Sequence, residues 1–444
     1  MGFTIKMEKS ECPSASCGGN IDQVITAMNR ATNCIAIYLL LFVTELFAAS
    51  TNSWIATWAT SPQSGTPDPR EPLLKIDNQT VRERVRASIG GSQIRLRFSN
   101  EFGSSPLLIG AATVAIPTNA SSIKEESIQN VTFEGRNSIE IPVGAPALSD
   151  AIKFRLAPGA EISITIYFPK RLTTPTLHAF AFKHAALSQH GDFTHENKID
   201  PAAVSTASIS VTAVLVPARP SNRLVVAFGD SISDGDGSTV DADNNYPNNL
   251  IRRIAKTPNA STLAVVNEGI VGNRLLRDTD VFGVSALARF DRDALVLPGV
   301  IHIVLLEGIN DIGFAGAKMD GQYLANPAET PSAKDIIDAY RQLISRAHAR
   351  GIKVIGATIT PCEGVEIPGY YSEAKESVRE TVNKWIRTGG AFDGIIDFDA
   401  VVRDPDHPSR LLPKFASKDH LHPNGVGYKA MADSVDLALF GRLD

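Results

Sequence analysis

The chain has 444 residues, and its 43 Lys and Arg residues against 48 Asp and Glu residues leave a formal net charge of −5. A chain of this length normally divides into two or three domains, each long enough to bury a core of its own. The near balance of charge argues against nucleic-acid binding, which usually shows as a basic patch.

The N-terminal segment has the pattern of a secretory leader. Cys34 to Ala49 is an apolar stretch that follows Arg30 and ends in the small residues Ala48-Ala49-Ser50. It is shorter than the roughly 20 residues that span a bilayer, so it predicts a signal peptide within a leader of residues 1–50. The alternative is a membrane anchor. Met28 would be a better start than Met1, and we expect a secreted, extracellular protein without stable membrane insertion.

Cysteine usage is sparse after this leader. Cys12, Cys17 and Cys34 lie in or before it, which leaves Cys362 alone in the mature chain and excludes an intrachain disulfide there. Sequons that fit a secreted glycoprotein stand at Asn78, Asn119, Asn130 and Asn259.

Residues 51–218 have the signals of short antiparallel strands. Ile94, Leu96 and Phe98 alternate with polar residues, and so do the apolar residues of 162–168. This period of two predicts strands with one buried and one solvated face, as in a β-sandwich. Further candidate strands are Ile139–Ile141 and Ser208–Val216.

Four histidines are crowded into the same region, at His178, His184, His190 and His195. Their spacing matches no compact ligand motif, and no cysteine accompanies them, so we expect histidines of strands and loops rather than a metal site.

After a linker at Pro217–Asn222, residues 219–444 alternate apolar strands with amphipathic helices. The expected strands are Leu224–Phe228, Leu263–Val266, Ile301–Leu306, Val354–Ile359 and Ile395–Phe398. One helix is expected from Ser332 to Gly351 and another from Ser372 to Gly389. Such alternation predicts a parallel sheet covered on both faces, with ligands at the carboxyl ends of its strands.

Four blocks with the residue types of nucleophilic catalysis occur in this second domain. They are Gly229-Asp230-Ser231, Gly269-Ile270-Val271-Gly272-Asn273-Arg274, Gly308-Ile309-Asn310-Asp311 and Asp419-His420-Leu421-His422. The first three follow expected strands, so a single pocket can gather Ser231, Gly272 and Asn310. Each block alone has an ordinary explanation, such as a helix cap or a turn; their order makes the combination specific.

The order Ser, Gly, Asn, His resembles the GDSL-type, or SGNH, hydrolase family. The resemblance covers the C-terminal half, and the segment from Trp54 to about Val216 looks like the β-rich domain of one secreted branch. It implies a jelly-roll-like β-sandwich followed by a three-layer α/β/α, flavodoxin-like hydrolase domain.

The chemistry of these residue types is consistent with that resemblance. Ser231 is the expected nucleophile, His422 its general base and Asp419 the carboxylate that orients the base. His420 competes for the role of the base, but the Asp-x-x-His spacing favours His422. Expected oxyanion donors are the backbone N–H groups of Ser231 and Gly272 and the side-chain amide of Asn310.

Two neighbouring residues receive weaker assignments. Arg274 is a candidate contact for a polar substrate, with an exposed, solvated arginine as the alternative, and Asp311 is expected to tie loops together. No phosphate-loop lysine follows the glycines at 235–237, and the serine mechanism needs no metal or other cofactor.

The sequence therefore predicts a secreted, monomeric serine esterase of the SGNH type. Its expected partner is an ester substrate: short acyl groups, such as acetyl, on carbohydrate or on small esters. The alternatives are a lipase or lysophospholipase, or a non-catalytic carbohydrate-binding or host-interaction protein with a vestigial hydrolase domain.

Overall fold

The computed structural model describes residues 53–64, 75–257 and 260–441. The predicted leader of residues 1–50, the cysteines at 12, 17 and 34 and the sequon at Asn259 lie outside the described residues. Cys362 is described, and it is a buried free thiol. Among the described residues, no helix is both long and apolar enough to cross a membrane.

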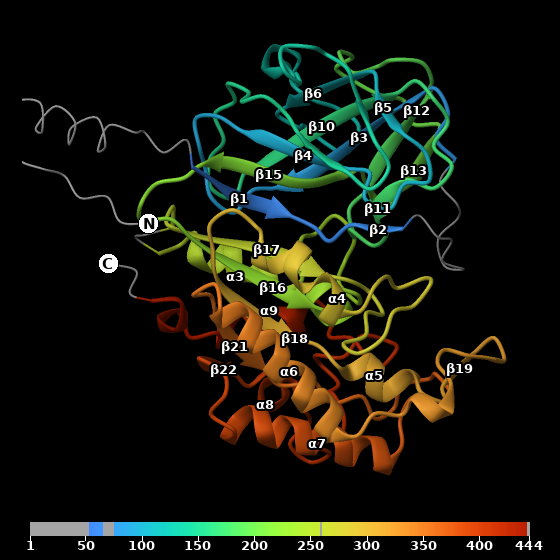
Figure 1. The fold of residues 1–444 in the computed structure, drawn as a ribbon, viewed down its shortest axis with the longest axis vertical. Coiled ribbons are helices and arrows are strands. Elements are labelled where there is room, and N and C mark those ends of the chain that lie inside the picture. Colours follow the sequence, from blue (N-terminus) through green and yellow to red (C-terminus); the bar gives the residue numbers. More distant parts are fainter. Residues whose placement is uncertain (1–52, 65–74, 258–259, 442–444) are drawn as a thin grey trace, which may run out of the picture. The chain divides into compact units, whose positions relative to one another are not determined.

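The first half of the described chain, blue to green in Figure 1, consists of short antiparallel strands, as predicted. A six-stranded sheet has the order β13-β12-β3-β10-β6-β7, with β3 at Gln79–Arg86, β6 at Ala111–Ala115, β7 at Gln129–Asn130, β10 at Glu161–Phe168, β12 at Ala185–His190 and β13 at Ala203–Ser205. A four-stranded sheet has the order β1-β15-β4-β9, with β1 at Trp54–Ala59, β4 at Arg95–Ser99, β9 at Pro146–Leu148 and β15 at Val211–Pro217. The jelly-roll topology and the domain boundaries 51–218 and 219–444 stay predictions.

Smaller pieces complete this region. They are the three-stranded sheet β14-β11-β2 (Ser208–Ile209, Thr176–His178, Gln63–Ser64), the pair β5-β8 (Leu107–Ile109, Ile139–Ile141) and the 3-10 turn η1 (Glu125–Ser127). The strand expected over Ser208–Val216 is divided into β14 and β15, because Ser210 between them has a φ of 63° and leaves the extended conformation.

One expectation about β10 is wrong. Its apolar residues are buried as predicted, but Ser163 and Thr165 on the opposite face are also buried, each 1% exposed. The loop after β12 covers that face: Arg82 of β3 donates from Nε to Thr165 Oγ1 at 2.9 Å and from Nη2 to the carbonyl of Glu196 at 2.6 Å. A buried polar layer, in which Arg82 and Thr165 are hydrogen-bonded, therefore fills the space that the alternation pattern assigned to solvent.

The second half forms a five-stranded parallel sheet with the order β17-β16-β18-β21-β22. Its strands are β16 (Arg223–Gly229), β17 (Leu263–Gly269), β18 (Val300–Leu306), β21 (Lys353–Ala357) and β22 (Gly394–Ile396). In chain order this is 2-1-3-4-5, the flavodoxin-like order that was expected. Consecutive residues of β16 and β18 are buried, which requires cover on both faces of the sheet.

The helices that provide this cover form two groups. Helix α3 (Tyr246–Ile254) packs against α9 (Gly425–Ser434), while α6 (Ala333–His348) packs against α7 (Glu373–Thr388) and α4 (Ala286–Phe290). Ser332 and Ser372 cap α6 and α7 as predicted. Shorter elements are α2 (Ser231–Asp234), α5 (Ile309–Phe314), α8 (Phe398–Val402), the π-helical turn η2 (Asp291–Leu295), the 3-10 turns η3 (Pro327–Glu329) and η4 (Leu437–Phe440), and the pair β19-β20 (Lys318–Met319, Gln322–Tyr323).

The last expected strand, Ile395–Phe398, ends earlier than predicted. Asp397 accepts a hydrogen bond from the backbone N–H of Ala400 and so caps a helix that begins at Phe398. The capping side chain overrides the strand preference of an apolar run.

Candidate active site

Three of the predicted blocks emerge at one edge of the parallel sheet. The register pairs Gly229 of β16 with Gly269 of β17 and with Leu306 of β18, so these three strands end side by side. Ser231 begins α2 directly after β16, Gly272 lies in the turn after β17, and Asn310 lies in the first turn of α5 after β18.

The turn between β16 and Ser231 requires a glycine for reasons of space. A Cβ at Gly229 would lie 2.3 Å from the carbonyl oxygen of Leu306 and 2.2 Å from Ser233 Oγ. The next residue, Asp230, accepts a hydrogen bond from the N–H of Ile232 and caps α2. The strand can therefore pass into the helix at once, which places Ser231 at the helix start.

Ser231, His422 and Asp419 form a continuous hydrogen-bonded chain. His422 Nε2 lies 2.8 Å from Ser231 Oγ, and His422 Nδ1 lies 2.6 Å from Asp419 Oδ2. The second carboxylate oxygen of Asp419 accepts from the N–H groups of Leu421 and His422 and from Ser417 Oγ at 2.6–3.0 Å. These donors fix the carboxylate, which in turn holds Nδ1–H on the histidine and leaves Nε2 to accept the serine proton.

The charges around His422 favour its protonated form. Its burial opposes a positive charge, but the carboxylates of Asp236, Asp419 and Asp230 outweigh this effect and raise the pKa of His422. Burial works against the charge of Asp419 too, yet its hydrogen bond to His422 and the charge of that ring hold the pKa of Asp419 well below its usual range. An imidazolium that forms during a proton transfer is therefore stabilised at this place.

His420, the competing candidate, lies outside this chain. It is exposed, its backbone has a φ of 58°, and its side chain lies beside Gly364.

The two backbone groups expected as oxyanion donors have no partner within the part of the chain that the structure describes. These are the N–H of Ser231 and the N–H of Gly272. Gly272 has a φ of +72°, and a Cβ there would lie 2.4 Å from the ring of Phe282, so the turn excludes any larger residue.

Asn310 is held in one orientation by two contacts. Its Nδ2 donates to the backbone carbonyl of Asn273 at 2.9 Å, and its Oδ1 accepts from the hydroxyl of Tyr370 at 3.0 Å. Because a carbonyl oxygen only accepts, Nδ2 rather than Oδ1 must face Asn273. The second hydrogen of Nδ2 remains available for a substrate oxygen.

Arg274 is buried and not exposed to solvent. The residue is 3% exposed and donates to Glu329 at 2.7 Å, with Asp311 also near. The alternative of a solvated arginine is therefore wrong, while a contact with substrate stays a prediction. Asp311 accepts from the N–H groups of Leu275 and Leu276, so it ties the turn after β17 to α5 as expected.

The structure adds residues that the motifs did not single out. Tyr370 orients Asn310, and Arg289 lies fully buried beneath the turns, with donors to the carbonyl of Gly229 at 2.8 Å and to Asn273 Oδ1 at 2.9 Å. His178, one of the crowded histidines, contacts Asp234 of α2. No sequence signal pointed to these contacts, because each joins segments far apart in the chain. Among the described residues, no cluster of three or more potential metal ligands is present.

Solved structures with some likeness to the chain include esterases and a lipase. A carbohydrate acetylesterase family member from Sinorhizobium meliloti is 14% identical with a TM-score of 0.36, over 48% of this chain and 94% of that one. The acetyl xylan esterase AlAXEase is 21% identical with a TM-score of 0.34, over 48% and 96%. A GDSL-like lipase from Bacteroides thetaiotaomicron VPI-5482 is 19% identical with a TM-score of 0.35, over 50% and 90%. Likenesses at such TM-scores do not define a function.

No curated protein matches the chain significantly. A match to a family supplies the assignment instead: residues 227–430 fit the model of the GDSL-like Lipase/Acylhydrolase family. This range includes all five predicted site residues, which are Ser231, Gly272, Asn310, Asp419 and His422. Residues 227–430 therefore form a GDSL-like Lipase/Acylhydrolase domain, and this domain makes the protein a carboxylic ester hydrolase.

Proposed function

We propose that the protein is a secreted serine esterase that removes short acyl groups, acetyl above all, from carbohydrate or small esters through an acyl-enzyme. The observation that carries the mechanism is the chain of hydrogen bonds from Ser231 through His422 to Asp419, at 2.8 Å and 2.6 Å. The leader and the sequons of the sequence support export and glycosylation.

In the first half of the reaction, Ser231 Oγ attacks the ester carbonyl while His422 Nε2 removes its proton. The negative charge on the carbonyl oxygen is stabilised by the N–H groups of Ser231 and Gly272 and by Nδ2 of Asn310. His422 then gives its proton to the leaving alcohol oxygen, and the acyl group stays on Ser231. Asp419 keeps the ring in place and stabilises its charge.

In the second half, a water molecule replaces the alcohol. His422 accepts a proton from the water as it attacks the acyl-enzyme, and the same three donors stabilise the second tetrahedral intermediate. The proton returns to Ser231 Oγ, and the carboxylic acid leaves. Both attacks and both departures take place at the same carbonyl carbon, so one oxyanion site serves both halves.

The preference for short acyl groups is supported by an aromatic row beside the donors. The ring of Phe282 packs on Gly272, Phe314 follows at 5.6 Å between ring centroids, and Tyr370 follows Phe314 at 5.9 Å. Tyr370 in turn contacts Asn310. We infer that these bulky rings, which adjoin two of the three donors, limit the length of the acyl group.

The test is hydrolysis of p-nitrophenyl esters from acetate to palmitate, together with acetylated glycans, by the mature protein and by Ser231→Ala. We expect the highest kcat/KM for acetate and loss of all turnover in the variant. A preference for palmitate would indicate the lipase alternative. No hydrolysis by the wild type on any ester would contradict the proposal in favour of the non-catalytic alternative.

A further inference from the structure

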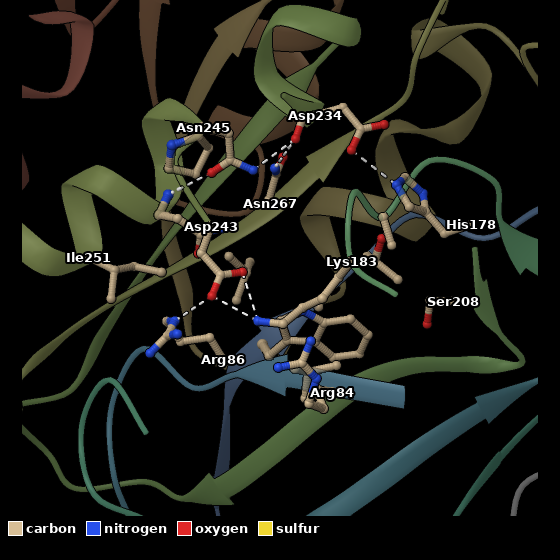
Figure 2. Close-up of a pocket in the computed structure, with 18 of the residues that line it drawn as sticks. Arg84, Arg86, His178, Lys183, Ser208, Asp234, Asp243, Asn245, Ile251 and Asn267 are labelled. Atoms are coloured by element: carbon tan, nitrogen blue, oxygen red, sulfur yellow. Dashed lines mark hydrogen bonds and ion pairs between the residues drawn. The ribbon is translucent and has the colours of Figure 1, made fainter. Parts of the chain in front are cut away.

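The N-terminal β-rich region makes buried polar contacts with the supports of the catalytic residues. Ser53–Asp444 form one compact unit, and β1 lies beside β17. Figure 2 shows a cavity at this junction, with His178 directed at Asp234 and Lys183 at Asp243. The cavity has a volume of about 80 Å³, which is room for a few water molecules and not for a glycan. The junction is thus a packed polar interface.

His178 contacts Asp234, which lies three positions after the nucleophile Ser231 in the sequence. It is 3% exposed, its Nδ1 lies 3.0 Å from the carbonyl oxygen of Ser61, and its Nε2 lies 3.1 Å from Asp234 Oδ1. A carbonyl oxygen only accepts, so Nδ1 must carry a hydrogen. A carboxylate oxygen faces Nε2, so a second proton must lie between the ring and Asp234.

The electrostatics favour retention of that second proton. Burial disfavours a charge on His178, but the neighbouring carboxylate of Asp234 outweighs this and raises the pKa of the histidine. Burial also raises the pKa of Asp234 itself. The pair therefore shares one proton in either of two forms, and in both forms a hydrogen bond connects the β-rich region to α2.

Asp234 also contacts the turn after β17, which contains Gly272. It is the last residue of α2, three positions after Ser231, and its Oδ2 accepts from the N–H of Val271 at 3.1 Å. Val271 directly precedes Gly272. One carboxylate thus joins His178, the helix that begins with the nucleophile, and the peptide before an oxyanion donor.

Ser61 provides a second connection of the same kind. Its carbonyl receives His178, while its Oγ accepts from Nη1 of Arg289 at 2.9 Å. Arg289 also donates to Asn273 Oδ1, and the carbonyl of Asn273 receives Nδ2 of Asn310. Chains of two or three hydrogen bonds therefore connect the segments that hold the three expected donors to His178 or Ser61 of the β-rich region.

We propose that His178 is a positioning residue of the esterase site: its proton-sharing contact with Asp234 holds the turn that presents the N–H of Gly272 to the substrate oxygen. The β-rich region is then a part of the catalytic unit. This inference rests on the proposed serine-esterase mechanism.

A second histidine of the β-rich region supplies a matched control. His184 Nδ1 lies 2.6 Å from Asp241 Oδ2, so it too forms a His–Asp pair with the second half of the chain. That pair is open to solvent, with side chains 44% and 35% exposed, and Asp241 also receives Arg84. Asp241 lies in the loop between α2 and α3 and makes no contact with the turn around Gly272 among the hydrogen bonds of the described residues.

The test compares two amide replacements of His178. In His178→Gln the amide nitrogen takes the place of Nε2 and can still donate to Asp234. In His178→Asn the amide takes the place of Nδ1, keeps the contact with Ser61 and does not reach Asp234. Both variants replace the same imidazole ring with an amide side chain. If His178 only fills space, both variants should therefore have the same effect on kcat.

Activity is measured as kcat and KM on p-nitrophenyl acetate, per serine titrated with a phosphonate, alongside the melting temperature. We expect His178→Asn to lose roughly ten- to a hundredfold in kcat with little change in KM, as for a misplaced catalytic group. His178→Gln should retain most of the wild-type kcat, and His184→Ala should be unaffected. Equal kcat for the Asn and Gln variants, or an equal loss in His184→Ala, would overturn the inference.

Asp234→Asn gives an independent result should His178→Asn fail to fold. Its amide nitrogen can donate to His178 Nε2, while its carbonyl still accepts from Val271, so the connection persists without a charge. We expect nearly full kcat, and a large loss would overturn the proposal. Wild-type activity that disappears in Ser231→Ala establishes the esterase mechanism whatever the His178 variants do, so the two proposals fail separately.

Discussion

Replacement of Asn310 by alanine separates transition-state stabilisation from local packing. The change removes the only side-chain donor of the expected oxyanion site and leaves Ser231, His422 and Asp419 in place. Loss of one such donor costs roughly a hundred- to a thousandfold in kcat, or about 2.7–4 kcal/mol, and leaves KM nearly unchanged because the charge develops only in the transition state.

The same change has a structural cost that the contacts allow to be estimated. Asn310 is 2% exposed, and its removal leaves the hydroxyl of Tyr370 and the carbonyl of Asn273 without this partner. Each unsatisfied buried group costs about 1–3 kcal/mol of unfolding free energy. The melting temperature of Asn310→Ala is therefore expected to fall, which by itself does not distinguish the two roles.

Tyr370→Phe is the control that distinguishes them. It leaves Oδ1 of Asn310 without its hydroxyl partner but keeps the bond from Nδ2 to Asn273 and the second Nδ2 hydrogen. We expect a stability loss with only a small fraction of the kcat loss, measured on p-nitrophenyl acetate per titrated serine. Equal kcat losses in both variants, or full kcat in Asn310→Ala, would refute the assignment of Asn310 to the oxyanion site.

Ser231→Ala should abolish turnover with little change in melting temperature, because the hydroxyl takes part in the reaction and contributes little packed area. Phosphonate labelling of another residue, together with full activity in the variant, would show that Ser231 is not the nucleophile. His422→Ala should be as damaging and Asp419→Ala somewhat less so, since the residues act as a unit, whereas exposed His420→Ala should keep its activity. His422 must be neutral to act as the base, so kcat/KM should rise with pH. Because the surrounding carboxylates raise the pKa of His422, the midpoint of this rise should lie above the usual histidine pKa of about 6.5. A midpoint below that value would contradict the effect of the carboxylates.

The sequence by itself determined the features that depend on local patterns. The strands around Leu224–Phe228 and Ile301–Leu306 follow from short apolar runs, and the starts of α6 and α7 follow from capping serines. Because parallel strands end at one edge, the blocks with Ser231, Gly272 and Asn310 could be assigned to a common site before their contacts were known.

The tertiary structure alone decided what surrounds those residues. Burial of the polar face of β10, of Arg274 and of His178 depends on loops that return from distant parts of the chain, and a period of two or a lone histidine contains no information about them. His178 and Asp234 are 56 positions apart, and Tyr370 and Asn310 are 60 apart. A hydrogen bond between such residues exists only after both segments are packed, so the residues that position the site are set by packing, while those proposed to carry the chemistry are set by motif.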